Sequence, residues 1–254
     1  MSTPVLLVAL GVGGMAVGWF LNTVIVRLPE GESLRPPPRC PECEAPLAAV
    51  DTVPVVSWLR LRGRCRACDE PIPLGYPLVE VGNAVSWVAA GLCFGARWVL
   101  VPYLFLFSVL LAQAVIDLEL YRLLDRITYP AIVVSLVALP LAALTLEHPR
   151  RAVLGAAIGG VGYFVFLFLP ALVYPRGMGM GDVKLAALMG LHLGLIHPVL
   201  VLYSVILACL LGLAAGLVLF FARGRESRAF PFGPWLALGC VLAVVFHTSL
   251  LPTL

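Results

Sequence analysis

The chain has 254 residues, of which 61% are hydrophobic and only 12% are charged. Soluble domains carry about a quarter charged residues, so these charges are too few to cover a water-facing surface of this size, and membrane lipid must cover part of it. The formal net charge of +3 gives no support for a nucleic-acid partner.

Eight apolar segments predict an all-α polytopic membrane protein, since a helical crossing needs about 20 residues. They are residues 4–28, 77–95, 98–118, 128–146, 152–174, 183–196, 198–222 and 232–253. We interpret the first as a retained transmembrane helix, because it is too long for a secretory signal and lacks both a basic start and a clear cleavage site. His197-Pro198 separates the sixth from the seventh, although these two could also form one kinked helix.

Eight successive crossings would place the connecting loops alternately on the two sides of the membrane, and Lys and Arg are distributed unevenly between these sides. Fourteen fall on one side, namely Arg27, Arg35, Arg39, Arg60, Arg62, Arg64, Arg66, Arg122, Arg126, Arg176, Lys184, Arg223, Arg225 and Arg228. Three fall on the other, namely Arg97, Arg150 and Arg151. Because cytoplasmic loops are enriched in basic residues, the pattern predicts that the first loop is cytoplasmic and that both termini lie outside.

Between the first two apolar segments lies one soluble insert, roughly residues 29–75. It contains two Cys-x2-Cys pairs, Cys40 with Cys43 and Cys65 with Cys68. Two such pairs can surround one zinc ion tetrahedrally, and a closed four-thiolate shell indicates a structural metal that supplies folding energy to a small domain. The alternative is two disulfides or four free thiols, but a cytoplasmic loop keeps thiols reduced. We therefore divide the chain into a first transmembrane helix (1–28), a zinc-binding domain (29–76) and a transmembrane domain (77–254).

Three acidic residues, Glu80, Asp117 and Asp182, lie within or at the edge of apolar segments. Such residues are costly in a membrane and are functional candidates. Asp117 closes the third segment and Asp182 opens the sixth, so both are expected at the cytoplasmic side. Two close carboxylates that share one proton can act as base toward water and acid toward a carbonyl, as in aspartic proteases. The alternative, a helix N-cap at Asp182 and an interfacial acid at Asp117, stays open from spacing alone.

Several segments, read in order, resemble one family along nearly the whole chain. They are Gly18-Trp-Phe-Leu-Asn-Thr-Val-Ile-Val-Arg-Leu-Pro29, Tyr76-Pro-Leu-Val-Glu80, Ile116-Asp117-Leu-Glu-Leu-Tyr-Arg-Leu-Leu124-Asp125, Gly177-Met-Gly-Met-Gly-Asp182-Val-Lys184 and Phe230-Pro-Phe-Gly-Pro234. Together with the four-cysteine loop they resemble the type IV prepilin leader peptidases, which are GxGD-type intramembrane aspartic proteases. Two positions depart from the family pattern: Leu124 stands where the family usually has Pro, and Trp19 replaces a small residue.

The resemblance implies an enzyme of the bacterial inner membrane that cuts the leader from type IV prepilins or type II secretion pseudopilins. Asp117 and Asp182 match the positions of the family's catalytic pair. Many members also methylate the new N-terminus with S-adenosylmethionine, and the cysteine-bearing loop is typical of those bifunctional members. The resemblance therefore predicts a peptidase with N-methyltransferase activity.

A methyl-donor site is harder to locate, because the sequence has no Gly-rich strand–helix unit of the Rossmann type. Glu80, Asn22 and the cysteine loop are the candidates for binding the cofactor. The alternatives are a Glu80 carboxylate paired with an arginine such as Arg27, and an Asn22 amide that only links two helices.

Two other classes of protein compete with a protease. A proton-relaying transporter would predict acids near mid-membrane and broken helices in matching halves, neither of which is clear here. A non-catalytic zinc-containing scaffold would leave the Gly-rich segment before Asp182 unexplained.

Overall fold

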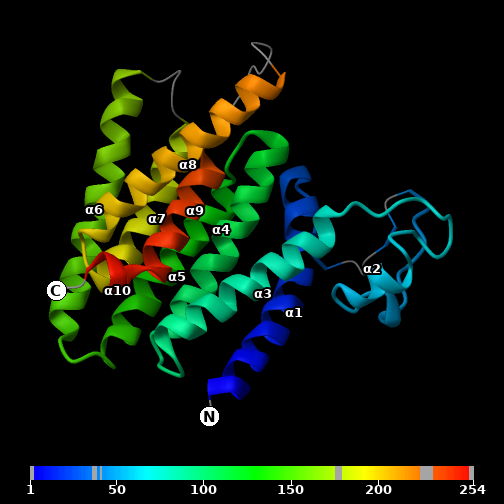
Figure 1. The fold of residues 1–254 in the computed structure, drawn as a ribbon, viewed down its shortest axis with the longest axis horizontal. Helices are drawn as coiled ribbons and strands as arrows, with labels where there is room; N and C mark the ends of the chain where they lie inside the picture. Colours follow the sequence, from blue (N-terminus) through cyan, green and yellow to red (C-terminus); the bar gives the residue numbers. More distant parts are fainter. Residues whose placement is uncertain (1–2, 36–38, 41, 175–178, 224–230, 252–254) are drawn as a thin grey trace. The chain divides into compact units, whose positions relative to one another are not determined.

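The computed structural model describes residues 3–35, 39–40, 42–174, 179–223 and 231–251 (Figure 1). In these ranges the regular structure is helical, and the only β pairing is two isolated bridges. The chain divides into two compact units, Met1–Ala96 and Arg97–Leu254. Each unit builds its own candidate site.

In the first unit, helices α1 (Thr3–Glu30) and α3 (Gly75–Phe94) pack against each other in opposite directions (Figure 1). Glycines on α1 allow this close contact. A Cβ at Gly14 would lie 2.7 Å from Ala84 Cα, and a Cβ at Gly18 would lie 2.6 Å from Glu80 Cα. Small residues let helix backbones approach in this way in membranes, and the contact places Asn22 of α1 beside the first turns of α3.

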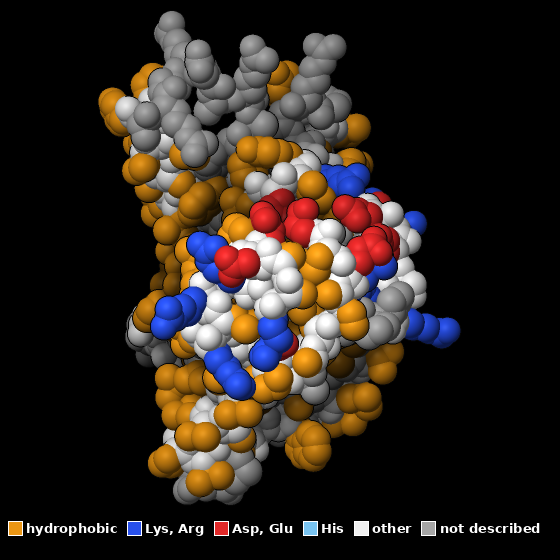
Figure 2. Space-filling view, turned by 90° about the vertical axis from the view of Figure 1, so that its right-hand side faces the viewer, with side chains coloured by type: hydrophobic (Ala, Val, Ile, Leu, Met, Phe, Trp, Pro, Cys, Tyr) orange, Lys and Arg blue, Asp and Glu red, His pale blue; other side chains and the backbone are white. Residues whose placement is uncertain are grey.

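The insert between α1 and α3 has little regular structure. It contains the 3-10 helix η1 (Ala49–Asp51), the short helix α2 (Val56–Arg60) and two cysteine-bearing turns. Figure 2 looks onto the insert and shows acidic and basic side chains gathered over it. Some of these charges pair, as Arg64 does with Asp69 at 2.8 Å and Arg66 does with Asp51.

The second unit is a helical bundle with α7 at its centre. Its helices are α4 (Leu100–Leu120), α5 (Asp125–Ala143), α6 (Pro149–Val173), α7 (Met180–Ile196), α8 (Leu200–Arg223), α9 (Gly233–Val245) and α10 (His247–Leu250). Helix α7 contacts α4, α5, α6, α8 and α9, and its residues Leu185, Leu188 and Met189 are fully buried. The first turn of α7, which carries Asp182, is therefore held by the rest of the bundle.

Helices α6 and α7 meet through glycines on both sides. A Cβ at Gly159 would collide with the Gly190 carbonyl and would lie 2.8 Å from Gly194 Cα, while a Cβ at Gly194 would collide with the Gly155 carbonyl. Backbone-to-backbone packing of this kind fixes the register of two helices, because no side chain separates them.

The predicted all-α, multi-pass membrane architecture is confirmed. Within the described residues, six helices are long and apolar enough to cross a membrane: α1, α3, α4, α5, α6 and α8. Helices α7 and α9 lie in the two remaining predicted segments but, with 17 and 13 residues, are shorter than the six spanning helices, so the count of eight spans stays a prediction. Exposed apolar residues along α8, such as Leu210, Leu213 and Val218, suit a lipid environment.

The sixth and seventh predicted segments are separate helices. Helix α7 ends at Ile196 and α8 begins at Leu200. His197 between them is extended, with φ −164° and ψ 132°, as expected for a residue that precedes proline. The single kinked helix considered from the sequence does not form.

Candidate functional site

Asp117 lies three residues before the end of α4 and is 6% exposed. Its Oδ2 accepts a hydrogen bond of 3.0 Å from the backbone N–H of Gly233, the first residue of α9. A Cβ at position 233 would lie 2.7 Å from that oxygen, so only glycine allows this approach. The start of α9 therefore orients the Asp117 carboxylate.

Asp182 is the third residue of α7 and is half-buried. The Asp182 N–H donates to the Gly179 carbonyl at 3.2 Å, a Cβ at Gly179 would lie 3.5 Å from Asp182 Oδ2, and Asp117 is near enough for the two carboxyl groups to interact. The structure thus brings the two predicted acids together at one end of the second unit. Gly177, the first glycine of the predicted motif, lies outside the described residues.

The short α4–α5 loop lies against the start of α7, which carries Asp182, and the start of α9, whose Gly233 N–H binds Asp117. Tyr121, the residue directly after α4, is left-handed at φ 54° and donates its N–H to the Asp117 carbonyl at 2.9 Å. Leu123 then packs beside glycines on both sides: its Cβ is 2.9 Å from where a Cβ of Gly181 would be, and its Cδ2 is 3.1 Å from where a Cβ of Gly233 would be. Sequence reasoning did not identify Leu123, because nothing local marks it.

Asp125 lies at the first position of α5 and forms an ion pair with Lys184, two residues after Asp182. Lys184 Nζ is 2.9 and 2.8 Å from the two Asp125 carboxylate oxygens and 4.9 Å from the centre of the Tyr129 ring. The Asp125 side chain is 52% exposed, which agrees with its expected position outside the apolar segment. The pair connects the starts of α5 and α7.

In the first unit, the thiols of Cys40, Cys43, Cys65 and Cys68 converge, with all four Sγ atoms within 4.8 Å of one another. Cys40 and Cys65 are buried and the other two are exposed. The backbone N–H groups of Cys68 and Ala67 lower the pKa of the Cys65 thiol to about 7, whereas burial and the neighbouring thiols raise the pKa of Cys68. Because the four sulfur atoms lie close enough together to ligate one ion, this cluster can hold a metal ion.

The two cysteine turns have the same local structure. Cys40 N donates to Ala45 O at 3.0 Å, as Cys65 N does to Glu70 O at 2.8 Å. Each turn has an acidic residue at positive φ directly after its second cysteine, Glu44 at 56° and Asp69 at 62°. The sequence carries the corresponding repeat, Arg-Cys-x2-Cys-acid-x-Pro at residues 39–46 and 64–71, which the spacing argument did not use.

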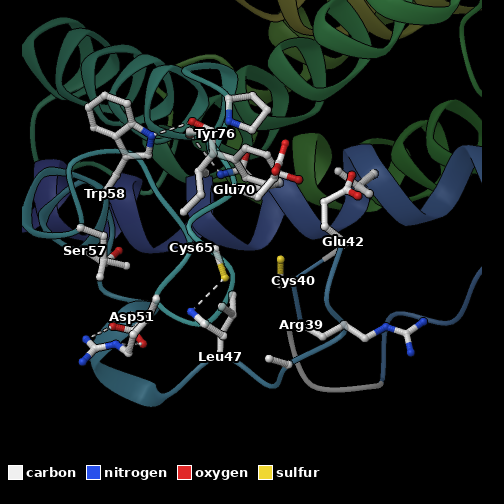
Figure 3. Close-up of a pocket in the computed structure, with 18 of the residues that line it drawn as sticks. Arg39, Cys40, Glu42, Leu47, Asp51, Ser57, Trp58, Cys65, Glu70 and Tyr76 are labelled. Atoms are coloured by element: carbon white, nitrogen blue, oxygen red, sulfur yellow. Dashed lines mark hydrogen bonds and ion pairs between the residues drawn. The ribbon is translucent and has the colours of Figure 1, made fainter.

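A cavity of about 420 Å³ lies next to the cysteine cluster and is lined by α1, the insert and the start of α3 (Figure 3). Its wall includes Trp19, Trp58 and Tyr76, and it also includes both methyl-donor candidates, Asn22 and Glu80. Trp58 is fixed by a 3.1 Å hydrogen bond from its Nε1 to the Ile72 carbonyl. The two cysteine turns form part of the same wall through Cys40 and Cys65, which Figure 3 shows close together.

Glu80 on α3 is 6% exposed, and its carboxylate connects α3 with the insert and with α1. Its Oε2 accepts the Val55 N–H at 2.7 Å, and its Oε1 lies 3.4 Å from Asn22 Nδ2, which also donates to the Tyr76 carbonyl at 3.1 Å. Asn22 therefore makes the helix–helix bond considered as its alternative role. The link between Glu80 and Val55 was not foreseen, because the carboxylate binds a backbone group that carries no sequence signal.

These features define a multi-pass helical membrane protein with a carboxylate pair at helix ends and a four-thiol cluster in an insert. Comparison with known proteins gives the family. Residues 12–94 match the Bacterial Peptidase A24 N-terminal domain, and residues 86–217 match the Type IV leader peptidase family. The chain belongs to the type IV leader peptidase family.

Several curated relatives carry the name prepilin leader peptidase/N-methyltransferase, and three of them are compared with this chain below. The chain is 37% identical to that of Myxococcus xanthus (strain DK1622), over 88% of this chain and 66% of the relative. It is 33% identical to that of Aeromonas hydrophila, over 93% and 89%, and 36% identical to that of Pectobacterium carotovorum subsp. carotovorum, over 94% and 92%. No solved structure matches the chain.

Proposed function

We propose that this protein cleaves the leader peptide of type IV prepilins or type II secretion pseudopilins, with Asp117 and Asp182 as the catalytic carboxylates. The observation that supports this most directly is their convergence at the end of α4 and the start of α7, where their charges interact. Membership of the type IV leader peptidase family supports the substrate class.

The chemistry needs one ionised and one protonated carboxyl group. The carboxylate takes a proton from a water molecule, whose oxygen attacks the carbonyl carbon of the scissile peptide bond, while the acid donates its proton to the carbonyl oxygen. The tetrahedral intermediate then collapses, the C–N bond breaks, and the leaving amine takes a proton. The N–H of Gly233 holds Asp117 in one orientation during these steps.

The reaction is proposed to occur at the cytoplasmic face of the bacterial inner membrane, with both termini outside, as the distribution of Lys and Arg predicts. A prepilin has a basic leader followed by an apolar helix. A soluble protease would have to extract that helix from lipid, at a cost of about 0.8 kcal/mol per CH2 group. A site at the ends of membrane helices can meet the bond at the lipid surface.

Zinc is the metal that we propose for the four cysteines, because four thiolates favour a tetrahedral zinc site with no open position. Such a site is structural. It would hold together an insert whose only described helical elements are η1 and α2, in the way that metals stabilise domains with small cores.

We also propose that the cavity beside the cysteines binds S-adenosylmethionine, whose bound form supplies a methyl group to the new N-terminal amine. The cavity volume falls in the range of small-molecule sites. Trp19, Trp58 and Tyr76 on its wall present aromatic surfaces that suit a sulfonium cation. Glu80 and Asn22 are the polar groups proposed to orient the donor.

The test is mass spectrometry of a synthetic prepilin after incubation with the purified full-length protein, which measures cleavage and methylation together. Asp117→Asn and Asp182→Asn should each reduce cleavage on the order of 10³-fold or more, as expected for essential acid–base groups. The double variant should be no worse, because groups that act as a unit are not additive. Asp69→Asn, an exposed acid of the insert, is the control. Substantial cleavage by either single variant would remove that residue from the mechanism.

A further inference from the structure

Gln113 is a fully buried amide on α4, one helical turn before Asp117. Its side chain pairs with both backbone groups of one loop residue. Gln113 Oε1 accepts the Leu124 N–H at 3.1 Å, and Gln113 Nε2 donates to the Leu124 carbonyl at 3.0 Å. Nε2 also lies 2.6 Å from Thr128 Oγ1 on α5. The amide therefore fixes the end of the α4–α5 loop and the first turn of α5.

The bonds made by Gln113 restrict the backbone at a position where the family pattern usually has proline. Leu124 has φ −89° and ψ 118°, an extended conformation somewhat beyond the φ of about −65 ± 15° that a proline ring imposes. Proline has no N–H and could not make the bond to Gln113 Oε1. In this chain, hydrogen bonding takes the place of the ring in restricting the loop.

The loop that Gln113 holds contains Leu123, whose side chain is wedged between Gly181, directly before Asp182, and Gly233, which binds Asp117. A shift of Leu123 would change the space between the starts of α7 and α9. These are the two segments that orient the carboxylates.

We infer that Gln113 is a positioning residue for the Asp117–Asp182 pair, acting by clamping Leu124 so that Leu123 sets the spacing between the start of α7, which carries Asp182, and the start of α9, which binds Asp117. The inference rests on the proposed function, because its effect is measured in peptide cleavage. It assigns Gln113 no contact with the substrate.

The first test compares Gln113→Met, which keeps the length of the side chain and removes its hydrogen bonds, with Ser135→Ala. Ser135 is also buried, but its hydroxyl donates to the Ala131 carbonyl of its own helix rather than to a loop. Gln113→Met should lower kcat about tenfold, as expected for misplaced reacting groups, with KM within about twofold of wild type. Amide hydrogen exchange of residues 121–125 should become faster. Ser135→Ala should change neither quantity.

A second substitution tests whether the clamp acts through Leu124. Leu124→Pro should also lower kcat, because proline removes the N–H that bonds to Gln113 Oε1 and leaves that buried oxygen without this partner. In that background, Gln113→Met should lower kcat by less than about threefold, since neighbouring residues that act on one element are not additive. An equal loss in both backgrounds would overturn the clamp, and a wild-type kcat for folded Gln113→Met would overturn the positioning role.

If Gln113→Met does not fold, Leu123→Ala decides the question. Its matched control is Leu120→Ala, an exposed leucine three residues earlier that is 43% accessible. A kcat that falls for Leu123→Ala but not for Leu120→Ala supports the inference. A wild-type kcat for Leu123→Ala overturns it. Failure of the proposed function looks different, because Asp117→Asn or Asp182→Asn would then keep cleaving whatever the Gln113 variants do.

Discussion

The two units of this protein build their candidate sites by different means. In the first unit, the insert has only two short helical elements, and its position depends on four converging thiols and on the buried Glu80 carboxylate. In the second unit, helices pack backbone to backbone through glycines, as α1 and α3 also do, but here one short loop, rather than an insert, bridges the starts of α7 and α9. The first site should therefore depend on a metal and the second on helix packing, so perturbations should affect them separately.

Removing a metal ligand should give the largest difference between the effects on the first unit and on the second. Cys40→Ser should reduce the zinc content from about one ion per chain to nearly none, since a structural site needs all four ligands. It should also abolish methylation, because the cysteine turns line the proposed donor cavity, while cleavage should continue. Elemental analysis and mass spectrometry of the product check both results.

The control for the metal prediction is Cys209→Ser, which changes a cysteine of α8 outside the cluster and should keep its zinc. If purified wild-type protein contains no zinc and has four titratable thiols in the insert, the metal site is wrong. If cleavage disappears with the zinc, the two sites are not separable.

Glycine packing in the second unit can be tested with two substitutions on one helix. Gly159→Ala would push a methyl group into the Gly190 carbonyl, whereas Gly162→Ala has open space around it. Overpacking of this kind costs about 1–3 kcal/mol, so Gly159→Ala should unfold at lower temperature in detergent and lose cleavage activity. Equal melting temperatures for the two variants would show that the α6–α7 contact is not this close.

Glu80→Gln tests the charge of the Glu80 side chain separately from its role in holding the insert of the first unit. The amide oxygen can still accept the Val55 N–H, so the insert should stay in place, but the negative charge facing the cavity and the hydrogen bond from Asn22 Nδ2 are lost. We expect methylation to fall about tenfold, the size of one charge-assisted interaction, with cleavage within about twofold of wild type. Glu32→Gln, an exposed acid outside the cavity, is the comparison. Wild-type methylation by Glu80→Gln would leave Glu80 with a structural role only.

The smallest effect is expected at the ion pair between Asp125 and Lys184. Because Asp125 is about half exposed, the pair should contribute less than about 1 kcal/mol. Asp125→Asn should lower cleavage less than about threefold, and added salt should reduce the difference. An inactive Asp125→Asn together with an active Asp117→Asn would mean that the wrong aspartate of this segment has been assigned.

The sequence by itself determined the features that depend on local pattern. Runs of apolar residues predicted the helices, because length and composition decide whether a segment can cross lipid. Ordered motifs predicted the family, which the comparisons confirm. The spacing of Cys40, Cys43, Cys65 and Cys68 predicted a cluster of thiols, and the structure brings the four together.

Only the tertiary structure decided which helix ends meet and what they bring into contact. The Gly233 N–H reaches Asp117 across 116 positions of sequence, and Glu80 reaches the Val55 N–H across 25. Gln113 binds Leu124 only because α4 and α5 pack side by side. In each case the partner is a backbone group, which every residue carries, so the sequence contains no signal for it. Helix register and crossing geometry, set by packing of the whole unit, select these partners.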